Sequence, residues 1–168
     1  CHMSNSKLHE LQWPYIHQLL RKMGMSRKTP EYLRHAPREF GGIAIPDLRL
    51  EAKIDQLELI IRTIRTPGNL QQLIIVHLNT MQHNSGLSKP LFQYPEQRAP
   101  HLEGHFYPYF RKSIASINIS LKIPSVTVPV IEREKDFLLM DEAIKTDLTD
   151  QEIEFTNYCR LYLQVRAI

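Results

Sequence analysis

The stretch that decides the fold is residues 36–65, APREFGGIAIPDLRLEAKIDQLELIIRTIR. It opens with a basic loop, turns at Gly41-Gly42, and passes through a short apolar run to Pro46. Asp47 stands where a helix N-cap belongs, because its side chain can accept a hydrogen bond from an N–H of the first turn. Apolar residues then recur at helical spacing: Leu50, Ile54, Leu57, Ile61 and Ile64. The stretch predicts a basic loop, a structural elbow at Gly41, Gly42 and Asp47, and a long helix.

The paired glycines do not form a phosphate-binding loop. No G-x-G-x-x-G pattern is present, and no Lys-Ser/Thr follows Gly42. Glycine is favoured where the backbone turns left-handed or where another backbone segment comes close. The elbow is therefore expected to aim the loop rather than to carry chemistry.

Helical patterns continue on both sides of this stretch. Trp13-Pro14 reads as a helix start with proline at the first position, and that helix is expected to end at Gly24. Thr29-Pro30 repeats the start signal for a short helix, with Thr29 as N-cap. Further on, Asn69 is expected to cap a helix that Gly86 closes. Because Pro67-Gly68 is a tight break between two long helices, these helices should pack as an antiparallel hairpin.

The second half of the chain is less regular. Residues 87–108 are rich in proline and lack periodicity, so they are expected to form an irregular connector and the boundary between two halves. Apolar and polar residues alternate over 119–123 and 126–130, which predicts a short β-hairpin turning at Pro124-Ser125. A helix is expected over 133–145, and a capping box from Thr149 to Glu152 opens the last one.

These patterns predict a mainly α fold: a helical hairpin or bundle with a small β element in the second half. Four regions follow from them. Residues 1–6 are a cloning remnant and flexible start, 7–86 a helical region, 87–108 the connector, and 109–168 a helical region with the β-hairpin. With 42% hydrophobic and 23% charged residues in 168, the composition is that of a globular protein.

Composition also restricts the cellular location that is expected for this chain. The apolar runs are too short to span a membrane. If Cys1 belongs to the cloning remnant, Cys159 is the remaining cysteine and cannot form an internal disulfide. An intracellular protein, nuclear or cytoplasmic, is expected.

Charge is distributed unevenly along the chain. Residues 1–130 carry 16 Lys/Arg and 9 Asp/Glu, whereas residues 131–168 carry 5 and 9. A local basic patch can bind a polyanion, although such a patch is also typical of a solvated face. The basic residues are densest at Arg21, Lys22, Arg27, Lys28, Arg34 and Arg38.

Catalytic patterns are weak. His101 and His105 lie four residues apart, the spacing of two metal ligands on one helical face. Gly104 and the nearby prolines disfavour a helix there, so no metal and no cofactor are expected. Cys159 has no histidine nearby in its helix to act as a base.

Several ordered motifs resemble a known family. These are Leu20-x-x-Met23-Gly24, the segment from Gly41-Gly42 to Leu48, Ile61-Arg62-Thr63-Ile64-Arg65 and Met81-Gln82-His83-Asn84-Ser85-Gly86. Further on come Arg133-x-x-Asp136-x-x-Leu139-Met140 and Asn157-x-Cys159-Arg160-Leu161-Tyr162-Leu163. Together they resemble the region downstream of the catalytic palm in reverse transcriptases of eukaryotic, non-LTR-like retroelements.

The resemblance implies a thumb-like region and a downstream connector without the polymerase centre. That centre needs an aspartate pair, and this sequence holds no Asp-Asp. The chain is therefore expected to be non-catalytic and to grip the backbone of an RNA or RNA–DNA duplex through the six basic residues. Tyr32 and Phe40 lie among these charges and could stack on a base or ribose, although core packing is the favoured role of Phe40. A protein partner, or the palm of the same polypeptide, would be a second contact. The alternative is a helical protein–protein interaction module with no nucleic-acid role.

Overall fold

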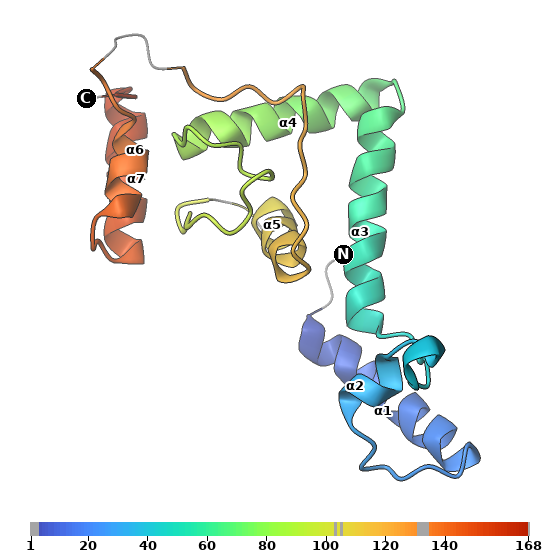
Figure 1. The fold of residues 1–168 in the computed structure, drawn as a ribbon. Helices are drawn as coiled ribbons and strands as arrows, with labels where there is room; N and C mark the ends of the chain where they lie inside the picture. The colour runs from blue at the N-terminus through green and yellow to red at the C-terminus, as the bar shows by residue number, and fades with distance from the viewer. Residues whose placement is uncertain (1–3, 103, 105, 131–134, 168) are drawn as a thin grey trace. The chain divides into compact units, whose positions relative to one another are not determined.

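The computed structural model describes residues 4–102, 104, 106–130 and 135–167 (Figure 1). The chain is 59% helical, which confirms the mainly α prediction. Its contacts divide it into two compact units, residues 1–58 and 59–168, and the division falls inside α3. The helices in the described residues are α1 (Asn5–Lys22), α2 (Glu31–His35), the 3-10 helix η1 (Arg38–Phe40), α3 (Leu48–Arg65), α4 (Asn69–Ser85), α5 (Phe106–Ser116), α6 (Leu139–Lys145) and α7 (Asp150–Leu163).

Helix α1 begins well before the predicted start at Pro14. Ser4 caps it, accepting a hydrogen bond from the backbone N–H of Lys7, so residues 4–6 are ordered rather than flexible. Pro14 lies inside the helix, where it removes one backbone hydrogen bond. Packing compensates for this loss, because Ile16 and Leu20 are buried in the core of unit 1. The burial of its apolar face, and not the position of Pro14, therefore decides the extent of α1.

The Gly-Gly segment joins α2 to α3 and completes the end of α2. Backbone N–H groups of Ile43 and Ile45 donate to the carbonyls of Leu33 and Arg34 at 2.9 and 2.8 Å. These bonds satisfy carbonyls that the short helix leaves open. Ile45 then joins the core formed by α1.

Each glycine of the elbow has its own role. Gly41 adopts φ +77°, the left-handed conformation that closes η1. At Gly42 an added Cβ would lie 2.0 Å from the carbonyl oxygen of Ala36, so only glycine fits. Asp47 caps α3, its carboxylate accepting the backbone N–H of Arg49 at 3.0 Å. From the other side, the buried side chain of Gln12 receives the N–H of Leu48 and ties α1 to this junction.

Unit 2 is organised around α4, whose buried face carries Leu78, Met81, Gln82 and Ser85. The residues that cover this region include Leu87, Leu91 and Phe92 of the predicted connector, all buried. Phe92 in turn packs against Phe110 of α5, with ring centroids 5.7 Å apart. Residues 87–108 are thus part of the core of unit 2, and the division between the two units lies elsewhere.

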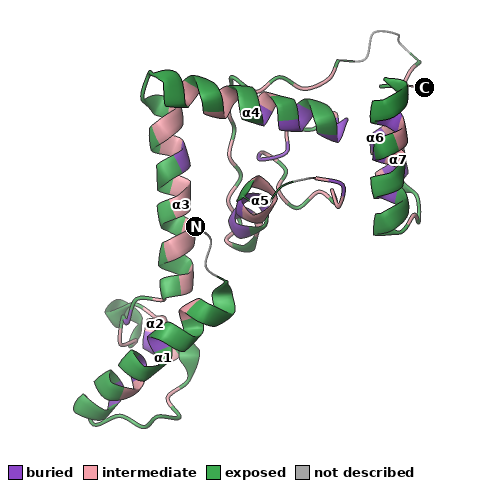
Figure 2. Ribbon diagram, turned by 180° about the vertical axis from the view of Figure 1, so that it is seen from behind, coloured by how far each residue is buried: buried purple, intermediate pink, exposed green. Residues whose placement is uncertain are grey.

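The expected hairpin of α3 and α4 does not form, because the two helices do not pack along their lengths. The packed helix pair is α6 with α7. Two observations account for this. In α3 only Ile60 is buried, and the rest of the helix is a mixture of exposed and intermediate residues (Figure 2). The buried residues of α4 lie in its second half, where segments that follow it in the chain cover them, and Leu70 and Leu73 in its first half are exposed.

The predicted β-hairpin is also absent: residues 119–123 and 126–130 contain no strand. Their backbone groups bond to other parts of unit 2. Leu121 N–H donates to Phe92 O at 2.8 Å, and Thr127 N–H to the Asn79 side chain at 2.8 Å. The turn at Pro124-Ser125 does occur. The alternation of apolar and polar residues therefore belongs to a non-helical segment that bonds to Phe92 and to α4, and not to a sheet.

The last two helices form the acidic end of the chain. Helix α6 begins at Leu139, later than predicted, because Leu138 forms an antiparallel bridge with Ala167. The first part of the predicted helix, 133–134, lies outside the described residues. Helix α7 opens with the predicted capping box, in which Thr149 N–H donates to the Glu152 carboxylate and Glu152 N–H donates to the Thr149 hydroxyl.

Gly86 should be intolerant of any side chain. It adopts φ +66°, and an added Cβ would lie 2.9 Å from Arg160 Cζ and from Met140 Cγ. The left-handed conformation alone costs a non-glycine residue about 1–2 kcal/mol. We expect Gly86→Ala to lower the free energy of unfolding by more than that, measured by urea denaturation followed by circular dichroism. Gly24→Ala is the matched control, because Gly24 has φ +70° and nothing within 4 Å. Equal losses in the two variants would contradict the close packing at Gly86.

Gln82 should be as important to unit 2 as any apolar core residue. Its buried amide donates to the carbonyls of Leu87 and Lys89, each at 3.1 Å, and accepts the N–H of Leu91 at 2.9 Å. Leaving buried backbone groups unpaired costs about 1–3 kcal/mol each. Gln82→Leu should therefore destabilise the protein by at least about 2 kcal/mol in the same urea experiment. Gln72→Leu, an exposed change on the same helix, should be close to neutral.

Candidate nucleic-acid interface

The six predicted basic residues occupy four successive parts of unit 1. Arg21 and Lys22 end α1, Arg27 and Lys28 lie in the loop before α2, and Arg38 lies on η1. These five side chains are exposed. Arg34, on α2, is buried. The tertiary structure thus separates one member of the set from the others.

Arg34 contributes to the packing of unit 1. Its Nε donates to the carbonyl of Thr29 at 2.7 Å, and its guanidinium lies 5.3 Å from the centre of the Trp13 ring. A guanidinium over an aromatic face is held by a cation–π attraction. Thr29 was predicted to cap α2, but Pro30 occupies that position and the Thr29 hydroxyl donates to Ser26 O instead. Arg34 therefore fixes the loop that presents Arg27 and Lys28.

The five exposed cations have no ion pair within the described part of the chain. Two aromatic side chains accompany them. Tyr32 is 72% exposed and Phe40 is 80% exposed, so the core role expected for Phe40 is not observed. Large exposed aromatic rings beside free cations are suited to contact sugar or base surfaces next to phosphates.

Arg49 pairs with acidic residues in this region, a contact that no sequence pattern indicated. Its guanidinium bonds to Asp47 at 2.9 Å and also to Glu31, which lies on a different helix. Glu31 was one of two acidic residues set against the basic cluster. Glu31 is thus paired with Arg49 and not with any of the five exposed cations.

The pKa values of the three groups reflect this contact. The hydrogen bond and charge of Arg49 hold the pKa of Glu31 below its ordinary value. Burial acts to raise the pKa of Asp47, but bonds from Arg49 outweigh it and the pKa is lowered. The pKa of Arg49 is raised in turn by both carboxylates. All three groups are therefore charged at neutral pH.

The same place holds ligand types that suit a metal. Ligand atoms of Glu31, His35 and Asp47 lie within 4.8 Å of one another. However, the Arg49 guanidinium already bonds to both carboxylates. The Nδ1 of His35 is within hydrogen-bonding distance of the Ile45 carbonyl, at 2.7 Å, and a carbonyl can only accept. The group therefore reads as an ion-pair network that joins α2 to the start of α3.

The histidine pair considered as a metal site is not assembled by the described residues. His105 lies outside them. His101 is buried, and its Nε2 lies 2.9 Å from the carbonyl oxygen of Ser85. Because that carbonyl accepts, Nε2 carries the proton, and Nδ1 has no partner. His101 is thus a core residue of unit 2 in its neutral form.

This burial should make the stability of unit 2 depend on pH. Burial, followed by the charges of Arg160 and Arg111, lowers the pKa of His101 below its ordinary value of 6.5. As pH falls through about 6.5, the unfolded chain takes up the proton first, so the free energy of unfolding should fall. Urea denaturation from about pH 7.5 to 5.5 would measure this slope. His101→Gln, which keeps all other histidines, should have a shallower slope; an unchanged slope would refute the role of His101.

Comparisons with protein-family models, curated proteins and solved structures found no match to this chain. No helix among the described residues is long and apolar enough to cross a membrane.

Proposed function

We propose that this chain is a non-catalytic nucleic-acid-binding region, similar to the thumb of a reverse transcriptase, that grips the backbone of an RNA or RNA–DNA duplex. The observation that carries the proposal is the set of exposed basic side chains with no ion pair among the described residues. They are Arg21, Lys22, Arg27, Lys28 and Arg38.

The physical basis is electrostatic. Lysine and arginine side chains that neutralise phosphates release condensed counterions, and this supplies affinity without reading sequence. Arg34 and Arg49 support the interface without contacting the duplex: Arg34 holds the loop, and Arg49 joins Glu31 of α2 to Asp47 at the start of α3. Tyr32 and Phe40 add surfaces for a ribose or an unpaired base.

Affinity for an RNA–DNA duplex should therefore fall as the salt concentration rises. The slope of log K against log salt should depend on the number of phosphate contacts. Each lost phosphate contact reduces the slope of log K against log salt by about 1. The double variant Arg27→Ala/Lys28→Ala should lower the slope by about 2, measured by fluorescence anisotropy across a salt series. The matched control, Lys112→Ala/Lys122→Ala, removes the same charge from exposed positions of unit 2.

Two results would overturn the proposal: no duplex binding at low salt, or equal loss in both double variants. A defined oligomer in light scattering, together with no duplex affinity, would favour the alternative of a helical protein–protein interaction module.

A further inference from the structure

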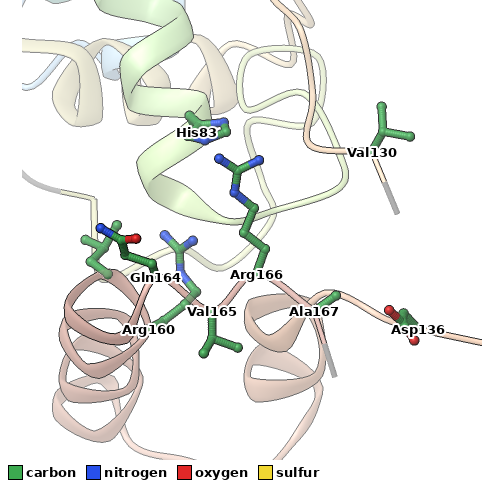
Figure 3. A pocket seen from close by; sticks show the side chains of 9 residues that line it. His83, Val130, Asp136, Arg160, Gln164, Val165, Arg166 and Ala167 are labelled. Carbon is green, nitrogen blue, oxygen red and sulfur yellow. The ribbon is translucent and has the colours of Figure 1, made fainter. Parts of the chain in front are cut away.

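A second concentration of positive charge lies in unit 2 and shares no residue with the basic loop of unit 1. It lines an open pocket of about 700 Å³ between the end of α4 and the segment that follows α7 (Figure 3). Figure 3 shows the side chains of Arg160, Gln164 and Arg166 directed toward α4, where His83 faces Arg166. The pocket is thus lined on one side by hydrogen-bond donors.

Arg160 is a buried cation, only 5% exposed, with neutral partners. Its Nε and Nη2 donate to the side-chain oxygen of Asn157 at 3.1 and 2.9 Å. Nη2 also donates to the backbone carbonyl of Asn84. These bonds fix the guanidinium but do not neutralise it. Buried charges in proteins are normally paired with an opposite charge, and Arg160 lines an open pocket that an anion can enter.

Arg166 adds a second positive charge to the same pocket. Its side chain has no hydrogen bond or ion pair with any described residue. Burial first, and then the charge of Arg166, lowers the pKa of Arg160, so the two guanidinium groups repel each other. Among the described residues that line the pocket, the acidic one is Asp136, and no ion pair joins it to either arginine.

We propose that this pocket binds a phosphate group, held by Arg160 and Arg166 with Gln164 and His83 at its sides. A guanidinium presents donors in a planar fork that matches phosphate oxygens, and Arg160 is already held in place. An anion between the two arginines would remove their repulsion and supply the charge that the described residues lack. The proposal does not depend on the basic loop of unit 1, because the two sites share no residue.

Binding of inorganic phosphate to the full chain tests this proposal. Arginine Nε–H signals in NMR spectra report directly on guanidinium contacts. We expect phosphate to shift the signals of Arg160 and Arg166 in a saturable way. Arg166→Gln should weaken binding about tenfold or more, the effect of losing about 1.4 kcal/mol. Because the Arg166 side chain is exposed and only its backbone bonds to Leu139, this variant should fold.

Arg65→Gln is the matched control, since it removes one exposed arginine from unit 2 outside the pocket. No shift at Arg160 or Arg166, or equal weakening by Arg65→Gln and Arg166→Gln, would overturn the proposal. A further arm identifies the source of the phosphate. A 5′-phosphorylated oligonucleotide that binds more tightly than inorganic phosphate, but only when Arg166 is present, indicates a nucleic-acid end. Equal affinity indicates a free phosphate ligand.

Discussion

The fold of unit 2 depends on polar side chains that hold an irregular backbone inside the core. Gln82 of α4 bonds to three backbone groups of residues 87–91. Arg111 of α5 donates to the carbonyls of Leu91 and Tyr94 at 3.0 and 3.1 Å, and also to that of Gln97. Without these bonds, burying Leu87, Leu91 and Phe92 would leave their own backbone unsatisfied, which costs as much as the burial gains. Packing and polar satisfaction are therefore inseparable here.

The need of buried polar groups for hydrogen-bond partners also explains why the arginines of this protein have different roles. Burial lowers the pKa of Arg111 to about 10, yet its donors all meet carbonyls. Arg34 and Arg49 are likewise occupied by neighbours in unit 1. Arg27 and Arg38 are exposed, and Arg160 is buried with neutral partners only. Both proposals rest on the last two kinds, because these arginines are exposed or line an open pocket that a ligand can enter.

Parts of the candidate interface could be predicted from residue order alone. The density of basic residues in 21–38 is a property of the sequence, and so is the need for glycine at the elbow. Which of these cations remain available to a ligand cannot be predicted from the sequence. Arg34, unlike Arg38, is buried, and its guanidinium lies over Trp13, a residue on another helix. Arg49 reaches Glu31 only because the elbow returns the chain to α2. The Arg160–Arg166 pocket gave no sequence signal, because its lining comes from three separate segments.

The sequence by itself determined the local structure: a mainly helical chain, the N-cap at Asp47, the capping box at Thr149, and the turn at Pro124-Ser125. Such features depend on residues within a few positions of one another, so local hydrogen bonding settles them. The tertiary structure alone decided what each surface meets. Pro14 lies inside a helix. The alternating residues 119–130 bond to Phe92 and to Asn79 of α4 instead of forming a sheet. The proline-rich segment is part of the core of unit 2. Those outcomes depend on partners distant in sequence, whose burial and hydrogen bonds outweigh local preference.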